Sequence, residues 1–145
     1  MSDPARLADS IPSGFVDPRL GGFAGDLGPI LRQDREGQVV SGFLVDARHC
    51  NPSGDCHGGW LSTFADVTMV RMARFGQAGM GQSGEGRWVT TALSLDFLRP
   101  VLVGDWVESD CLRLPAGARS CAVQGVARVR GGVVLRMNAA FRQIG

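Results

Sequence analysis

The residue types that could do chemistry gather in one short segment, 49–60. It reads His-Cys-Asn-Pro-Ser-Gly-Asp-Cys-His-Gly-Gly-Trp and holds both histidines of the chain. Gly58 and Gly59 would open a helix, where unpaired N–H groups and the positive end of the helix dipole lie. Since glycine has no side chain, a ligand oxygen can approach this backbone closely, as in an oxyanion hole. A tight loop-to-helix joint capped by His57 fits the same residues equally well.

Four side chains of this segment, His49, Cys50, Cys56 and His57, are of the types that bind zinc. The spacing of the two cysteines matches no zinc knuckle, and the two glycines that follow indicate another role for the segment. We therefore favour the alternative in which both thiols are small buried side chains, and we expect no metal.

Asp66 lies in the middle of the predicted helix, between Ala65 and Val67. Aspartate is a poor residue for a helix interior, and an isolated buried carboxylate is costly. Asp66 therefore needs either a partner or a function. The favoured hypothesis is a carboxylate that faces a cleft. The alternative is a solvated side chain on the polar edge of the helix, beside Ser62 and Thr63.

Gly58 and Asp66 are too far apart in one chain to serve one reacting group. They are separated by eight residues, which is about 12 Å along a helix axis. One carbonyl cannot contact both. If both belong to one site, the oxyanion hole comes from another subunit. Two antiparallel helices across a two-fold axis would place each Gly58 near Asp66 of the partner subunit.

The elements that must position these residues are one helix and several strands. Over 58–75, apolar residues recur at steps of three and four and cover most of the cylinder, which is typical of a buried helix. Strand patterns occupy 27–33, 38–48, 88–98, 105–114, 120–130 and 133–141. The fold class predicted is α+β, an antiparallel sheet of five to six strands wrapped round one long central helix. In the strand over 88–98, the alternation runs through Val89, Thr91, Leu93, Leu95 and Phe97.

Two segments stand apart from this pattern. Residues 1–25 are rich in Pro, Gly, Asp and Ser and are interpreted as an N-terminal arm before a domain of residues 26–145. Residues 76–86 are interpreted as a glycine-rich loop. Its G-x-G-x-x-G at 79–84 follows a predicted helix and precedes a strand, the reverse of the dinucleotide-binding order, so that function is rejected.

Composition excludes several classes of function. The chain has 145 residues, of which 44% are hydrophobic and 20% charged, and its net charge is +1. No strong field is present to hold nucleic acid or a membrane. All 15 basic residues are Arg and none is Lys, which removes Schiff-base and P-loop lysine chemistry. With no apolar leader and no CxxC among four cysteines, we expect a cytoplasmic protein with reduced thiols.

In these residues the sequence resembles the hotdog-fold thioesterases, most closely the phenylacetate-pathway type within the 4-hydroxybenzoyl-CoA thioesterase group. The resemblance spans about residues 26–143. It implies hydrolysis of an acyl-CoA or acyl-carrier thioester to free acid and thiol, without metal or any cofactor beyond the CoA of the substrate. It also implies a homodimer with sheets paired edge to edge, and a dimer of dimers. The strings that carry it are Asn51-Pro52-x-Gly54-x-x-His57-Gly58-Gly59, Ala65-Asp66 and Thr90…Leu95-x-Phe97-Leu98-Arg99-Pro100.

The resemblance also implies roles for single residues. Asp66 matches the catalytic carboxylate, which acts as general base or as nucleophile. Gly59 matches the oxyanion N–H donor at the helix start, with Gly58 beside it. Asn51 matches a loop residue near the thioester or the water, and His57 matches the residue that organises the helix start.

Three further positions follow from the same match. Thr90 matches a Ser or Thr near the carboxylate that could orient water, and Arg99 and Pro100 match the strand end close to the CoA arm. Arginine is the only cation available for the phosphates of CoA, and the unranked candidates are Arg71, Arg74, Arg87 and Arg99. Cys56 stands where a larger apolar residue is expected.

Two other functions stay open as alternatives. One is a hotdog dehydratase or hydratase, which would pair a catalytic His with an acidic residue at a different spacing. The other is a non-catalytic acyl-CoA binding module, for which a costly carboxylate at position 66 would have no use.

Overall fold

The computed structural model describes residues 8–75 and 87–145. Its helices are α2 (Gly22–Leu27), the short 3-10 helix η1 (Ala47–His49) and α3 (Gly58–Phe75). Its strands are β1 (Leu31–Arg35), β2 (Gln38–Leu44), β3 (Arg87–Phe97), β4 (Trp106–Gly117), β5 (Ser120–Val129) and β6 (Gly132–Ile144). The predicted glycine-rich loop at 76–86, with its G-x-G-x-x-G, lies outside the described residues.

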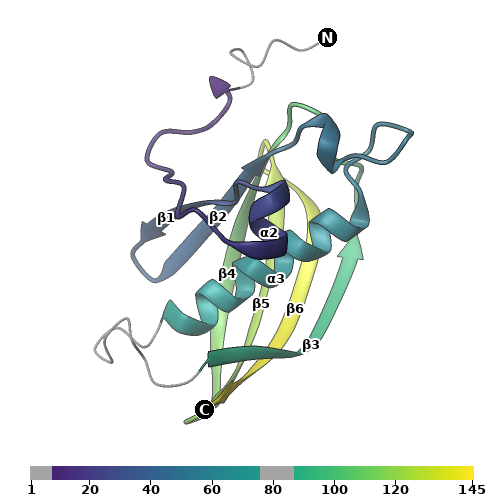
Figure 1. The fold of residues 1–145 in the computed structure, drawn as a ribbon. Helices are drawn as coiled ribbons and strands as arrows, with labels where there is room; N and C mark the ends of the chain where they lie inside the picture. Colours follow the sequence, from purple (N-terminus) through teal and green to yellow (C-terminus); the bar gives the residue numbers. More distant parts are fainter. Residues whose placement is uncertain (1–7, 76–86) are drawn as a thin grey trace.

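The six strands form one antiparallel sheet in the order β1-β2-β4-β5-β6-β3. The sheet curves around α3, and α2 lies on the other side of that helix (Figure 1). The expected α+β sheet wrapped round one long helix is therefore confirmed. At one edge, Val16 of the N-terminal arm pairs with Arg32 of β1 through two backbone hydrogen bonds of 2.9 and 2.8 Å. The opposite edge is β3, which makes its described ladder with β6 alone.

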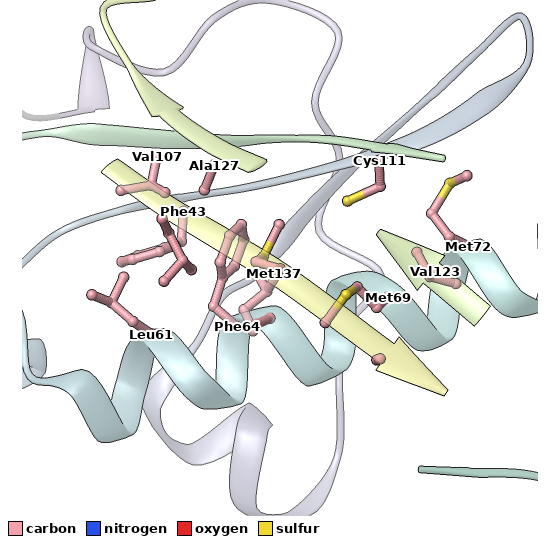
Figure 2. Close-up of a cluster of buried hydrophobic side chains, with 14 of the residues drawn as sticks. Phe43, Leu61, Phe64, Met69, Met72, Val107, Cys111, Val123, Ala127 and Met137 are labelled. Atoms are coloured by element: carbon pink, nitrogen blue, oxygen red, sulfur yellow. The ribbon is translucent and has the colours of Figure 1, made fainter. Parts of the chain in front are cut away.

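The core fills the space between α3 and the concave face of the sheet. Large apolar side chains of the helix meet apolar side chains from the middle strands (Figure 2). Burying each such side chain contributes roughly 1.5–3 kcal/mol, which explains why the helix needs apolar residues on most of its surface. The labelled members of this cluster are Phe43, Leu61, Phe64, Met69, Met72, Val107, Cys111, Val123, Ala127 and Met137.

Arg71 joins α3 to the first two strands and is not a free cation. Its side chain is 7% exposed. It donates hydrogen bonds of 2.9 and 3.1 Å to the carbonyl oxygens of Ile30 and Leu31, and one of 2.9 Å to Ser41 Oγ. Burial, more than any nearby charge, lowers the pKa of Arg71 to about 10. Of the four arginines considered for phosphate, this one is therefore occupied in the core.

The predicted elements agree with the structure, with differences at their ends. The helix over 58–75 is confirmed in full. The first strand begins at Leu31 instead of residue 27, because 22–27 form α2. The fourth strand continues through the predicted turn at 115–117, where a register shift between Pro115 and Gly117 accommodates the extra residue.

Among the described residues, no helix is both long and apolar enough to cross a bilayer.

Candidate active site

Asp66, in the middle of α3, forms a hydrogen-bonded pair with Thr90 of β3. Thr90 Oγ1 donates to Asp66 Oδ1 at 2.5 Å. Asp66 is half-buried and Thr90 is exposed, so the pair lies at the rim of the core next to the edge strand. A hydroxyl bond to one carboxylate oxygen fixes the orientation of the group and leaves the second oxygen to other partners. The predicted proximity of Thr90 and Asp66 is thus present in the fold.

A β-bulge in β3 explains how Thr90 reaches the helix side of the sheet. The register with β6 shifts between Thr90 and Ala92, so that Thr90, and not Thr91, stands opposite the buried Phe141. The side chain of Thr91 instead bonds to the carbonyl oxygen of Ala140 at 3.1 Å. The alternation expected from the sequence holds at the far end of the strand and is out of phase at Val89 and Thr91. Bulges often re-aim side chains in this way.

The first two N–H groups of α3, those of Gly58 and Gly59, differ in their hydrogen bonding. The carbonyl oxygen of His57 accepts the first helical hydrogen bonds, from Trp60 and Leu61, so His57 is the N-cap. Its Nδ1 accepts from the Gly59 N–H at 2.8 Å. The Gly58 N–H finds no acceptor in the part of the chain that the structure describes. Gly58 therefore offers the unpaired donor, while Gly59 is engaged by the cap.

Asn51 organises the loop that leads into the helix. Its Oδ1 accepts from the Ser53 N–H at 3.0 Å and the Asp55 N–H at 3.1 Å. The Gly54 N–H closes the turn on the Asn51 carbonyl oxygen at 3.0 Å. These bonds form an Asx turn, in which the side chain of Asn51 takes the place of a backbone acceptor. The side-chain carbonyl oxygen of Asn51 is thus committed to the loop.

The end of β3 and the residues after it border the helix start. A methyl group placed on Gly58 would lie 3.4 Å from Phe97 Cζ, so the Phe97 ring, 54% exposed, lies next to Gly58 at the start of the helix. Arg99 and Pro100 are exposed. The chain that follows them joins the loop before the helix, because the Cys56 N–H donates to the Val101 carbonyl oxygen at 2.7 Å. The backbone that follows Arg99 and Pro100 therefore reaches this end of α3, whereas Arg99 Nη1 lies 3.0 Å from a methyl group placed on Gly132, at the start of β6.

The two histidines of the zinc alternative have different surroundings. His49 is 2% exposed, its Nδ1 accepts from the Asp46 N–H at 3.1 Å, and its Nε2 lies 2.6 Å from the Leu27 carbonyl oxygen. It also stacks on Trp60 with ring centroids 4.6 Å apart. Both ring nitrogens of His49 are thus satisfied by backbone groups. Among the described residues no group of three or more potential metal ligands occurs.

The predicted residues form two groups along α3. Gly58, Gly59, His57 and Asn51 gather at its start, and Asp66 with Thr90 lies about 12 Å further along its axis. Phe97 was missed by the sequence reasoning as a neighbour of the site; the only signal available was its place in the matched string before Arg99. The different uses of the Gly58 and Gly59 N–H groups also left no trace in the sequence.

Comparison with known proteins places this geometry in a family. The model of the thioesterase superfamily matches residues 53–136. That range covers more than half of the chain and includes the helix start, Asp66 and Thr90. The chain belongs to the thioesterase superfamily.

Relatives agree with that membership. A candidate esterase of Pseudomonas aeruginosa is 41% identical over 83 residues, which is 57% of this chain and 58% of the relative. The aligned part therefore spans less than two thirds of that relative's length.

Solved structures identify the fold as the hotdog fold. AziG from S. sahachiroi is similar with a TM-score of 0.73 and 23% identity, over 87% of this chain and 98% of AziG. A mutant of the phenylacetic acid degradation protein PaaI from Thermus thermophilus gives 0.63 and 21%, over 74% and 86% of the two chains. A hypothetical thioesterase of Streptococcus pneumoniae, solved with coenzyme A, gives 0.64 and 21%, over 77% and 84%.

Proposed function

We propose that this protein hydrolyses an acyl-CoA thioester to the free acid and CoA thiol. The observation that carries the proposal is the occurrence on one helix of an unengaged N–H at Gly58 and a carboxylate, Asp66, oriented by Thr90. These are an electrophilic donor and a candidate base, the two groups that thioester hydrolysis requires. Support comes from the thioesterase superfamily match and from the similar S. pneumoniae thioesterase with coenzyme A.

The carbonyl oxygen of the thioester would accept the Gly58 N–H at the positive end of the helix dipole. The Gly59 N–H, bonded to His57, holds the helix start in place and would donate only after that bond opens. Asp66 of the partner subunit would take a proton from water, whose oxygen attacks the carbonyl carbon. The tetrahedral oxyanion would be stabilised by Gly58, and its collapse would expel the CoA thiolate, which takes up the proton held by Asp66.

Thr90 would keep Asp66 oriented during this step. Because its hydroxyl is donated to Asp66 Oδ1, Oδ2 is the oxygen left for the attacking water. Asn51 Nδ2 would contact the thioester or the water from the loop side. Arg99, beside the end of β3, would meet the phosphate-bearing arm of CoA, and the exposed Arg74 and Arg87 are further candidates.

The proposal needs two copies of the chain, because the two groups lie about 12 Å apart in one copy. The edge strand β3 is the natural contact. It is 11 residues long, and its helix-facing side carries exposed Leu93 and Phe97, 39% and 54% exposed. A long apolar edge strand has unpaired backbone N–H and C=O groups that can pair with a strand of another chain. Pairing β3 with β3 of a second copy would form a homodimer that brings each helix start toward Asp66 of the partner subunit; a dimer of dimers stays a prediction.

The test is free-thiol release from a panel of aryl- and acyl-CoAs, with wild type, Asp66→Asn and Asp34→Asn measured together. Removing the proposed base should lower kcat by about 10²–10⁴. Asn can still accept the Thr90 hydrogen bond, so folding should be unaffected. Asp34 is an exposed residue of β1 paired with Arg32, and its Asn variant should retain full activity.

Three results would contradict the proposed hydrolysis. An Asp66→Asn variant with wild-type kcat would remove Asp66 from the mechanism. Binding of the panel without release of thiol by the wild type would identify the non-catalytic binding module, and addition of water to enoyl-CoAs would identify the hydratase.

A further inference from the structure

Cys50 and Cys56 lie directly opposite each other across the loop that precedes α3. They form an antiparallel β-bridge. The two backbone hydrogen bonds that flank it, of 2.8 and 2.7 Å, join the residues next to the cysteines and not the cysteines themselves. The pair is therefore of the non-hydrogen-bonded type, in which opposite side chains come closest.

This type of pair meets the geometric requirement of a disulfide. Its Cα atoms are typically about 4.5 Å apart, with both side chains on the same face. Disulfides need a Cα separation of about 4.4–6.8 Å. The typical separation of such a pair lies inside this range, so the backbone pairing of Cys50 with Cys56 is of a type that a disulfide can bridge.

The two thiols differ in access. Both are free; Cys50 is partly exposed, with its Sγ 3.5 Å from the Asp46 carbonyl oxygen, whereas Cys56 is 6% exposed. Burial raises the pKa of Cys50, and burial together with the nearby Cys50 raises that of Cys56 to about 12. Because the thiolate is the nucleophile, reaction should start at Cys50 and become faster as pH rises.

We propose that Cys50 and Cys56 are a modification site that forms a reversible intramolecular disulfide with a low-molecular-weight disulfide such as oxidised glutathione. The Cys50 thiolate attacks one sulfur of the oxidant and displaces one glutathione thiolate. The Cys56 thiolate then attacks Cys50 Sγ and displaces the second. The two cysteine thiols are oxidised with loss of two protons, and the oxidant is reduced to two thiols. This inference does not depend on the proposed hydrolysis.

The link would close a ring of residues 50–56. That ring contains the Asn51 turn, and its last residue lies two positions before Gly58. The oxidised protein should therefore melt at a higher temperature than the reduced protein, since a cross-link restricts the unfolded chain. The other two cysteines cannot substitute, because Cys111 faces Gly125 and Cys121 faces Pro115 across the β4–β5 ladder.

The experiment incubates the folded chain with excess oxidised glutathione at mildly alkaline pH until the thiol count is constant. Free thiols are then alkylated in denaturant, and intact mass and peptide maps are recorded. We expect two of the four thiols to remain, a mass loss of two hydrogens before alkylation, and a peptide that joins Cys50 to Cys56. Reduction should restore all four thiols and the original melting temperature.

Matched variants sharpen the result. Cys121→Ser should still form the link, and Cys56→Ser should retain one glutathione on Cys50 because the second displacement is blocked. The proposal is overturned if the wild type keeps four free thiols, if it keeps a glutathione adduct, or if the link involves Cys111 or Cys121. Because the wild-type chain carries the decisive result, a variant that fails to fold does not affect the conclusion.

Discussion

The two parts of the proposed active site, one at the start of α3 and one in its middle, are built in different ways. At the start of α3, the donor is a backbone N–H, and its position is set by bonds between near neighbours, such as Gly59 N–H to His57 Nδ1. In the middle of the helix, the carboxylate of Asp66 is oriented by Thr90, which is 24 residues away in sequence. The helix start is therefore a local structure, whereas the carboxylate pair exists only when β3 docks on α3.

This difference separates what each end contributes. The helix start supplies fixed dipoles at no cost in reorganisation, but no group there is assigned to take a proton. The Asp66–Thr90 pair supplies a proton acceptor but lies among side chains and strands, without a free helix N–H. The helix start has the N–H donor and the helix middle has the proton acceptor. In one chain the two are about 12 Å apart along the helix axis.

The largest effect at the helix start is expected from Gly58→Pro. Gly58 is the first helical residue, where proline fits the backbone and its missing N–H is not needed for the helix. Loss of this donor should lower kcat by about 10²–10³, measured as thiol release. Circular dichroism and melting should stay near wild type.

The matched control is Gly58→Ala, which keeps the N–H. Its methyl group would meet Phe97 Cζ at 3.4 Å, an ordinary contact distance, so its activity should stay within a few-fold of wild type. Equal losses in the two variants would show that space near Phe97, and not the N–H, limits activity.

Mixed dimers test whether the two ends come from different subunits. Gly58→Pro and Asp66→Asn chains, each nearly inactive, are unfolded together and refolded as a mixture. If the site joins Gly58 of one chain to Asp66 of the partner subunit, one site of each mixed dimer is intact, and activity should recover to about a quarter of wild type. Refolded single variants serve as controls. A mixture no more active than those controls would contradict a shared site.

Thr90→Val tests the orientation of the carboxylate. The substitution keeps the shape of the side chain and removes the hydroxyl that donates to Asp66 Oδ1. Because a carboxylate that is free to turn is less well placed for the attacking water, kcat should fall by about tenfold, while Thr90→Ser should retain most of the activity. Kinetics that are identical in Val and Ser would mean that the bond is not used in turnover.

The helix and most strands of the sheet can be predicted from the sequence. The apolar steps over 58–75 predicted α3 because its burial on nearly all sides imposes that spacing. Asp66 stood out for the same reason, as a carboxylate among apolar neighbours. Gly58 and Gly59 fall at the helix start because the helical spacing of apolar residues begins there.

The details that could not be predicted depend on contacts between elements. The bulge near Thr90 changes which of two adjacent threonines faces the helix: strict alternation selects Thr91, and residue type does not mark the bulge that puts Thr90 there instead. Likewise, the sequence does not show which glycine N–H is unpaired, because this depends on the hydrogen bond from the Gly59 N–H to the His57 ring. The edge position of β3 follows from strand order, which periodicity does not encode.

The smallest effect is expected from His57→Ala, and it distinguishes a cap from a catalytic group. The change removes the acceptor of the Gly59 N–H. Loss of an N-cap costs about 1 kcal/mol, which should lower the melting temperature by roughly 3 °C in a domain of this size. Activity should change less than in Thr90→Val, and His57→Asn, which restores a capping oxygen, should recover the stability. A fall in kcat as large as that of Gly58→Pro, with unchanged melting, would instead place His57 in contact with the reacting groups.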